Sequence, residues 1–350
     1  MGAIDPIDFG RPMLRLRVFS GRFAQRIDLR AVGWSLAILA AALAVAGAGL
    51  LSGAYPITAD DLANLIGGTA DERVHMVVLE WRLPRIAAAL FLGASLGASG
   101  AIFQSLTRNP LGSPDVVGFD AGAYAGALAA MLLLGAGPAL VGGCAFLGGL
   151  ATAACVYLLS RGTGGVGLIV IGIAVGAILA SLNTWMLAGA RLEVAASAAF
   201  WGAGSLNGID TAALGATAAL EAVLLAWALA LSRSMRQLEL GDDLACASGV
   251  RTERTRLLLV FVGVGLTALV TATAGPISFV ALAAPQLARR FTGSPHLSIA
   301  SAAAMGGLLL AAADYTAHHA FAPTQLPAGL ITLPLGGLYF VWLLLRETGR

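Results

Sequence analysis

The sequence predicts an all-α, polytopic membrane protein with about ten transmembrane helices, and three observations support this fold class. Of its 350 residues, 58% are hydrophobic and only 11% are charged, whereas soluble domains carry about 25% charged residues. Apolar runs long enough to cross a bilayer follow one another along nearly the whole chain. All 21 basic residues are arginine, and they are distributed very unevenly between alternate connections.

Ten apolar segments have roughly the length that a membrane span requires, which is about 20 residues. They are 31–53, 84–106, 115–135, 138–160, 166–188, 212–232, 256–275, 277–291, 297–319 and 327–345. The eighth is short and follows the seventh after Gly275 and Pro276, so we expect a tight turn and a partly inserted helix there. Residues 31–350 are therefore expected to form one transmembrane domain.

The arginines indicate the orientation of the spans. With the N-terminus in the cytoplasm, 17 arginines fall inside and four fall outside, namely Arg73, Arg82, Arg85 and Arg191. Cytoplasmic connections are enriched in basic residues, so this topology is favoured. Residues 1–30 contain six arginines and no apolar core. We interpret them as a cytoplasmic basic tail and not as a cleaved signal peptide.

The absence of lysine from the sequence excludes several function classes. There is no P-loop lysine, so ATP-driven work would have to be done by another chain, and there is no Schiff-base lysine. The spans contain no nucleophile–base pair and no metal-ligand cluster, which argues against an intramembrane enzyme. Glu221 falls inside the sixth predicted span, and we expect a structural or interface role for it. Asp314 lies near the outer end of the ninth span, where we expect it to hydrogen-bond to a neighbouring helix.

A charged segment, 233–256, lies between the sixth and seventh spans and is placed in the cytoplasm by the arginine count. Gly241 is expected to end the preceding helix, and Asp242 or Asp243 to cap a short new one. Leu244, Ala247 and Ser248 would share a face of that helix, which Gly249 would end. The segment predicts a compact knob that fits a groove on a partner, although a solvated loop is the plainer alternative.

The segment 82–100 carries further local signals. Pro84 suits the first turn of a helix, and Gly93, Gly97 and Gly100 would form a small-residue face for close helix packing. Arg82 and Arg85 run against the positive-inside trend. They either snorkel to the interface or form a cationic patch that docks an acidic surface.

The outer connections also carry two signals. Thr58 and Asp61 fit a helix cap, and 189–211 suits a segment lying in the interface.

The motifs at 81–115, 240–256, 269–293 and 313–337 together resemble the FecCD/BtuC-type permease family of ABC importers for iron–siderophores, haem and cobalamin. The resemblance runs from about Trp34 to Glu347. Within the family, the segments 99–106, 108–116, 182–185, 204–208 and 241–246 are most similar to the permease subunits of ferric-enterobactin importers. This implies the type II ABC importer permease fold, with ten spans in each permease subunit.

The resemblance also implies roles for individual residues. The segment that contacts the ATPase maps onto Gly241, Asp242, Asp243, Leu244, Ala247, Gly249, Arg251 and Arg254. Docking of the binding protein maps onto Arg82 and Arg85, with His318 where some members carry another arginine. Narrowing of the pathway maps onto Gln104, Asn109 and Leu111, and onto Gly165 and Val166. No catalytic or metal-binding residue is implied.

The resemblance further implies a paralogous permease as heterodimer partner, two ATPase subunits that bind ATP and Mg, and a periplasmic or lipoprotein binding protein. No cofactor belongs to this chain, lipid surrounds it, and no nucleic-acid partner is expected. The implied location is the inner membrane with a cytoplasmic N-terminus, and the implied cargo is a ferric siderophore, such as a catecholate. Haem or cobalamin import remains an alternative. An ion-driven secondary transporter is another, but it would need paired mid-membrane acids, and only Glu221 is a candidate.

Overall fold

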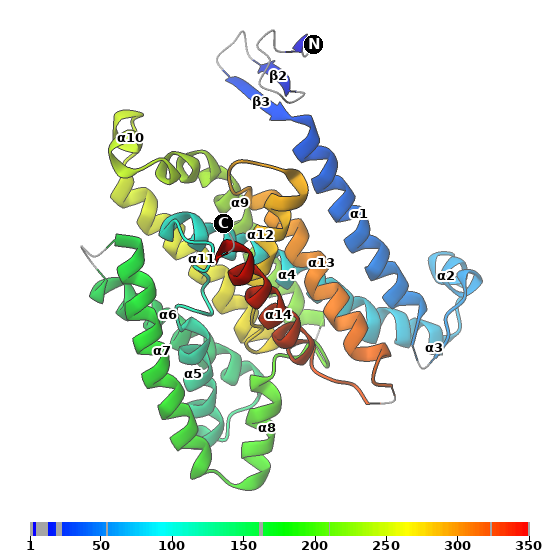
Figure 1. Ribbon diagram of the computed structural model, residues 1–350. Helices are drawn as coiled ribbons and strands as arrows, with labels where there is room; N and C mark the ends of the chain where they lie inside the picture. The colour runs from blue at the N-terminus through cyan, green and yellow to red at the C-terminus, as the bar shows by residue number, and fades with distance from the viewer. Residues whose placement is uncertain are drawn as a thin grey trace.

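The computed structural model is a bundle of helices in which every one of the ten predicted spans is a helix (Figure 1). The structure describes residues 3–4, 13–18, 23–53, 55–160, 164–209, 211–322 and 324–348. The helices that correspond to the predicted spans are α1 (Leu29–Leu51), α4 (Leu83–Thr107), α5 (Phe119–Leu134), α6 (Pro138–Leu159), α7 (Gly164–Ala188), α9 (Thr211–Glu239), α11 (Thr252–Ala274), α12 (Val280–Thr292), α13 (Ile299–His319) and α14 (Ala328–Thr348). The prediction of ten helices is confirmed.

Seven helical stretches among the described residues are long and apolar enough to cross a membrane. They are Leu29–Leu51, Glu72–Thr107, Pro138–Leu159, Gly167–Ala188, Leu214–Glu239, Thr252–Ala274 and Ile299–His319. Two shorter apolar helices, Phe119–Leu134 and Ala328–Tyr339, complete the set, and α12 has only 13 residues. The chain is a multi-pass membrane protein that combines long helices with a few shorter ones.

The N-terminal region forms a small sheet before α1 begins. Its strands are β1 (Ala3–Ile4), β2 (Met13–Val18) and β3 (Phe23–Asp28), paired antiparallel in the order β1-β2-β3. Met13 lies opposite Asp28, and Val18 opposite Phe23. The sequence analysis expected only a basic tail here. Asp28 accepts hydrogen bonds from the N–H groups of Arg30 and Ala31, so the sheet leads directly into a capped α1.

Helix α4 forms the centre of the bundle and packs on α13 and α12 through glycine. A Cβ atom on Gly93 would lie 2.5 Å from the Gly306 carbonyl oxygen, and a Cβ atom on Gly97 or Gly100 would collide with backbone of α13 or α12. Glycine therefore lets the backbones approach within a distance that no side chain permits. The predicted small-residue face is present and determines which helices touch.

The beginning of α4 differs from the prediction. We expected an outer loop up to residue 83, but α3 (Glu72–His75) and a π-helical stretch η1 (Met76–Arg82) lead into α4 without a break. Pro84 therefore lies inside a continuous helical rod. The wider π turn precedes the proline ring and lets the helix accommodate the missing N–H. The capped helix predicted from Thr58 is confirmed as α2 (Ala59–Ile66), with the Asp61 carboxylate bonding back to the Thr58 N–H.

Helices α5 and α12 both begin in the interior of the protein. The carboxylate of Asp115, just before α5, accepts a hydrogen bond of 3.0 Å from the N–H of Phe279, which caps α12. Phe279 has a positive φ of 68°, a conformation that is uncommon for a bulky residue. Its ring packs against Gly336 of α14, where a Cβ atom would collide. The segment 108–118 is thereby held against the start of α12.

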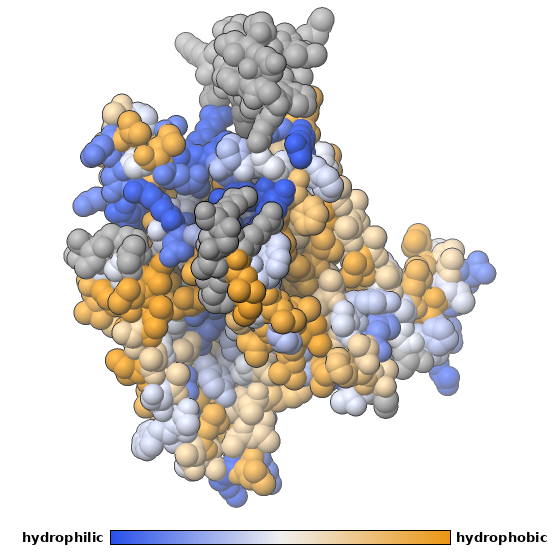
Figure 2. Space-filling model, in the orientation of Figure 1, coloured by the Kyte–Doolittle hydropathy of each residue, from blue (hydrophilic) through white to orange (hydrophobic). Residues whose placement is uncertain are grey.

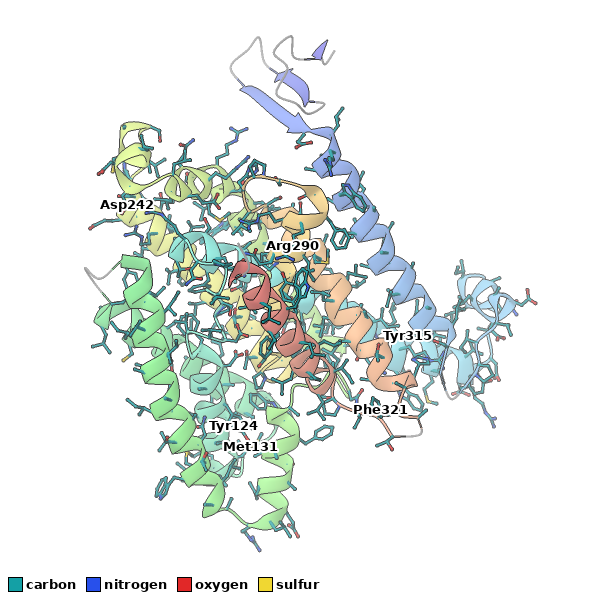
Figure 3. All side chains as sticks on the ribbon, viewed as in Figure 1. Tyr124, Met131, Asp242, Arg290, Tyr315 and Phe321 are labelled. Carbon is teal, nitrogen blue, oxygen red and sulfur yellow. The ribbon has the colours of Figure 1, made fainter. Side chains whose placement is uncertain are left out.

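The two ends of the bundle differ in charge. Figure 2 shows hydrophilic residues gathered around α10 (Asp242–Ala247) and apolar residues over the middle of the molecule. Arg290, near the α10 end, lies over the Trp342 ring of α14 with its guanidinium carbon 4.3 Å from the ring centroid (Figure 3). Arg73, Arg82, Arg85 and Arg191, which the sequence separates from the other arginines, lie in or beside α3, η1, α4 and α8 (Leu192–Gly202). We refer to the two ends as the α10 end and the α2 end.

Candidate functional site

The candidate site at the α10 end begins with a helix that is longer than expected. Helix α9 continues to Glu239, seven residues beyond the predicted span. It then reverses at Gly241, whose φ of 117° is a conformation that favours glycine. Helix α10 follows, and Gly249, with a φ of 86°, ends it before α11. The predicted knob of short helices separated by glycine is therefore present.

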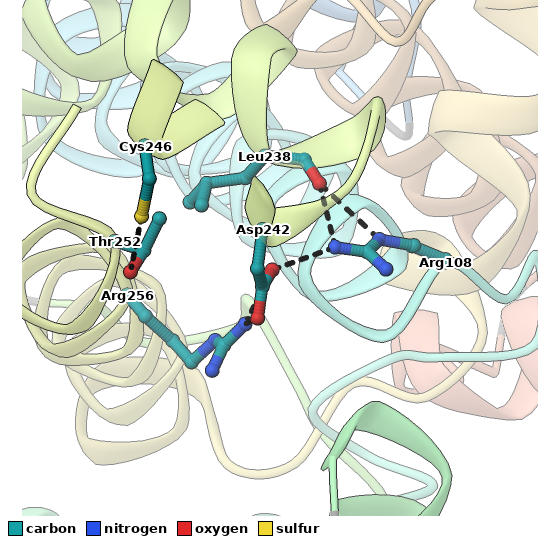
Figure 4. A network of polar contacts seen from close by, with 6 residues as sticks. All are labelled: Arg108, Leu238, Asp242, Cys246, Thr252 and Arg256. Carbon is teal, nitrogen blue, oxygen red and sulfur yellow. Dashed lines mark hydrogen bonds and ion pairs between the residues drawn. The ribbon is translucent and has the colours of Figure 1, made fainter. Parts of the chain in front are cut away.

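One carboxylate connects the helices of this knob (Figure 4). Asp242 pairs with Arg108 at the end of α4 at 2.8 Å and with Arg256 of α11 at 2.9 Å. Arg108 also donates to the Leu238 carbonyl of α9 at 2.9 Å, which accepts a second hydrogen bond from the N–H of Gly241 at 3.2 Å. Arg108 itself has a φ of 51°. Four helix ends are thus joined through one acid and two arginines.

The environment of Asp242 stabilises its charged form. The hydrogen bonds from Arg256 are the main reason why the pKa of the Asp242 carboxyl lies below its usual value. Burial opposes this lowering, and the attraction of Arg256 and Arg108 adds to it. Its side chain remains 48% exposed, so solvent screens these ion pairs considerably. We expect the network to fix the position of α10 more than to add stability.

The predicted capping role of Asp242 and Asp243 is wrong. The N-cap residue of α10 is Gly241, and no side chain caps this helix. The Asp242 carboxylate is occupied by the arginines of α4 and α11, and Asp243 is exposed. Because two charged hydrogen bonds to guanidinium are stronger than one bond to a neutral N–H, the tertiary contact displaces the local one.

The outer face of the knob is exposed. Leu244 is 60% exposed and Leu240 is 64% exposed, whereas Ala245 is fully buried and anchors α10 to the bundle. Ala247 and Ser248 are exposed beside Leu244, as the shared face predicted. Arg251 and Arg254 are exposed as well. The exposed face of the knob therefore combines leucine side chains with neighbouring arginines.

Sequence reasoning missed the two residues that hold the knob in place. Arg108 and Arg256 pair with Asp242, whereas the sequence analysis had selected Arg251 and Arg254 from the same region. Arg108 lies 134 positions from Asp242, so no local pattern could reveal the contact. The one available signal was that Arg108 follows a polar helix end in an otherwise apolar part of the chain.

Arg82 and Arg85, at the α2 end, are engaged within the bundle. Arg85 pairs with Asp314 of α13 at 2.8 Å, and its side chain is only 17% exposed. It also contacts Nδ1 of His318. Arg82 donates to the carbonyl oxygens of Leu50 and Tyr55. The expected hydrogen bonding of Asp314 to a neighbouring helix is confirmed. The docking role of Arg82, Arg85 and His318 stays a prediction, and a docking partner would have to share these internal contacts.

The structure brings together only some of the residues predicted to narrow the pathway, which we call the predicted gate. Gln104 is buried and donates to the Leu282 carbonyl at 2.9 Å, and it accepts from Gln286 at 2.7 Å. Asn109 accepts from the N–H of Leu111 at 2.9 Å, which closes the turn after α4. Gly165 and Val166 lie in the first turn of α7, and their side chains fall outside the described part of the structure. Gln286 was not selected from the sequence.

Glu221 is fully buried within α9. It lies beside Ser95 of α4, yet among the described residues neither carboxylate oxygen completes a hydrogen bond. In the part of the chain that the structure describes, no group of three or more His, Cys, Asp and Glu side chains could hold a metal ion.

The sequence profile of the FecCD transport family matches residues 29–346. The chain belongs to the FecCD transport family. This FecCD chain is 49% identical to the ferric enterobactin transport system permease protein FepG of Escherichia coli K12, over 89% of its own length and 96% of FepG. It is 35% identical to the Fe(3+) dicitrate permease protein FecD of the same organism, over 87% and 96% of the two chains.

A solved structure has the same fold as this FecCD chain. It is a metal-chelate type ABC transporter in an inward-facing conformation, with a TM-score of 0.80 and 25% sequence identity. The match covers 90% of this chain and 99% of the other. The expectation of an ABC importer permease fold is therefore confirmed over nearly the whole FecCD chain.

Proposed function

We propose that this chain is the transmembrane permease subunit of an ABC importer that carries a ferric siderophore into the cytoplasm. The observation that carries the proposal is the knob at the α10 end. Asp242 fixes it between Arg108 and Arg256, and it displays Leu244 outward. A rigid knob with an exposed leucine suits a groove on a separate ATPase, and membership of the FecCD family supports that use.

The α10 end is proposed to face the cytoplasm. The excess of arginine near this end supports the orientation, because cytoplasmic connections are enriched in basic residues. The N-terminus would then be cytoplasmic, and the α2 end would face outward. With an inner-membrane location, the α2 end would meet a periplasmic or lipoprotein binding protein.

The proposed assembly contains a paralogous permease, two ATPase subunits and the binding protein. ATP and Mg would be bound by the ATPases, since this chain has no lysine for a phosphate-binding loop. Closure of the ATPases would move the knobs, and the helix bundles would rock between outward-open and inward-open states. The likeness to FepG and FecD supports an iron–siderophore cargo, and 49% identity to FepG favours a catecholate.

A substitution on the exposed face of the knob tests the proposal. Leu244→Arg should abolish co-purification of the ATPase and uptake of ferric catecholate, while the chain itself stays folded. The matched control is Ile66→Arg, because Ile66 is 90% exposed on α2 at the opposite end and should leave ATPase binding unchanged. Intact ATPase binding and uptake in Leu244→Arg would refute the coupling role of the knob.

A double variant tests whether uptake is driven by the ATPase or by an ion gradient. Asp242→Ala combined with Arg254→Ala should reduce both ATPase co-purification and uptake. Uptake that survives loss of the ATPase but collapses on addition of an uncoupler would instead support a secondary transporter.

A further inference from the structure

A polar cavity of about 180 Å³ lies at the α10 end and is lined in part by Arg108, which binds Asp242 of the knob. Eight of its eleven lining residues are polar or charged, which is unusual in a bundle held together mainly by glycine and apolar side chains. They come from the end of α4, the end of α9, α12 and the connection before α13. The polar lining residues are Gln104, Ser105, Arg108, Asn109, Glu239, Gln286, Arg289 and His296.

Two buried polar atoms in this cavity are not satisfied by the protein. Ser105 is only 2% exposed, and its Oγ completes no hydrogen bond among the described residues, nor does Oε1 of Glu239. The Glu239 carboxylate nevertheless lies beside the Ser105 hydroxyl, the backbone N–H of Leu297 and the guanidinium groups of Arg236 and Arg289. Unsatisfied buried polar groups are costly, so this arrangement calls for a functional explanation.

The cavity lies between the knob and the predicted gate. Arg108 belongs to both, because it lines the cavity and binds the Leu238 carbonyl and Asp242. Glu239 follows Leu238 directly in the chain. The opposite wall is formed by Gln104 and Gln286, whose side-chain amides join α4 to α12 at 2.7 Å. Arg108 and Glu239 therefore connect α10 to the gate through this cavity.

The physical character of the cavity suits a joint between moving helices. Closely packed cores resist small displacements because each atom already contacts its neighbours. A polar cavity with room for water offers alternative hydrogen-bond partners, so helix ends can shift without losing all their contacts. Glu239 has such alternatives within reach, in Ser105 of α4 and in Arg289 of α12.

We propose that Glu239 is a positioning residue that transmits movement of α10 through this cavity to the Gln104–Gln286 contact. When the knob moves, Arg108 and the end of α9 move with it, and the Glu239 carboxylate changes partner between α4 and α12. That exchange shifts the two helices relative to each other and alters the turn at Asn109. The inference rests on the proposed coupling role of the knob and adds a specific route to it.

The complete importer, reconstituted in proteoliposomes with its second permease, ATPase and binding protein, provides the test. In Glu239→Gln and Glu239→Ala, the amount of ferric catecholate taken up per ATP hydrolysed should fall by at least about fivefold, the low end of typical coupling between sites. ATPase co-purification and basal hydrolysis should persist. The matched control is Glu193→Ala, an exposed acid of α8 that lies outside both the cavity and the knob.

A second readout does not depend on the cargo. In a background without the three cysteines, an Asn109→Cys thiol should change its labelling rate when nucleotide binds. Adding Glu239→Gln should abolish that change, while adding Glu193→Ala should preserve it.

The possible results distinguish this proposal from the proposed function. Wild-type uptake per ATP and wild-type labelling in Glu239→Gln would overturn the role of Glu239, and so would loss of ATPase binding in both Glu239 variants, which would place the residue in assembly. If the wild-type importer takes up no ferric catecholate but the labelling change persists and depends on Glu239, the cargo assignment fails and the transmission route stands.

Discussion

At the scale of single residues, charged contacts hold the two ends of the bundle in different ways. Arg85 and Asp314 form a largely buried pair between α4 and α13, where solvent screens little. Asp242, Arg108 and Arg256 form an exposed triad at the other end. The Arg85–Asp314 pair is expected to contribute to the stability of the fold, whereas the Asp242 triad is expected to fix the position of α10.

Removing one partner of the buried pair should be severe. Asp314→Ala leaves the Arg85 charge without its carboxylate, which typically costs about 3–5 kcal/mol. Replacing both residues, as in Arg85→Met with Asp314→Leu, should cost less than either single change because no uncompensated charge remains. Thermal unfolding in detergent measures the effect. Asp60→Ala, at an exposed acid of α2, is the control, and an equal effect of that variant would contradict the argument.

The pKa of Asp242 predicts a pH dependence with a definite sign. Arg256, and then Arg108, lower the pKa of this carboxyl in the folded protein. Its contribution to stability is therefore present above the unfolded value of about 3.9 and is lost as pH falls through the lower folded value. The contribution itself should not exceed about 1 kcal/mol, since the triad is exposed.

Comparison with Asp242→Asn checks this pH dependence. The stability difference between the wild type and the variant should be constant from about pH 6 to 8 and should shrink as the pH falls below the unfolded value of about 3.9. A difference that grew as the pH fell would contradict the assignment of the ion pairs. The position of α10, followed by ATPase binding at neutral pH, should be affected more than the melting temperature.

At the scale of elements, the glycine face of α4 decides which helices are neighbours. Gly97 lies against the Ala302 carbonyl of α13, and Gly100 lies against the Ala281 carbonyl of α12. The sequence pattern predicts that such a face exists, because glycines and alanines recur at helical spacing. It does not specify the partner helices, since any small-residue face would accept the same approach.

Adding a single methyl group at this face should disrupt it. Gly97→Ala forces α4 and α13 apart, and overpacking of this kind typically costs about 1–3 kcal/mol. Gly143→Ala is the matched control on α6, because a Cβ atom there meets nothing within 4 Å. The unfolding midpoints of the two purified variants measure the difference. Equal midpoints would contradict the close approach of α4 and α13.

The element boundaries also show where sequence reasoning reaches its limit. The cap at Thr58 and the breaks at Gly241 and Gly249 are encoded locally, and the structure places them as predicted. The start of α4 was misplaced because Pro84 usually begins a helix, whereas here a π-helical stretch precedes it. A π turn depends on the packing of the whole rod and leaves no clear local signal.

At the scale of the whole molecule, the distribution of arginine predicts how the bundle lies in the membrane. In a background without the three cysteines, an Arg191→Cys thiol should react with a membrane-impermeant reagent in cells whose outer barrier is opened. A Glu253→Cys thiol should react only after the inner membrane is permeabilised. The reverse pattern would invert the proposed topology, and with it the assignment of the α10 end to the ATPase.

The sequence alone determined the membrane class, the ten helices, the placement of the charged segment at one end and the family. The first three follow from the number and spacing of apolar residues, arginines and glycines, which act locally or through the partition between water and lipid. The family follows from the resemblance of the motifs at 81–115, 240–256, 269–293 and 313–337.

The tertiary structure alone decided that Arg108 and Arg256 hold Asp242, that Arg85 is bound to Asp314, and that Glu239 lines a polar cavity with Ser105. Arg108 and Asp242, for example, are 134 positions apart. Such contacts depend on which helices the glycine faces bring together, and a single sequence carries no direct record of that choice.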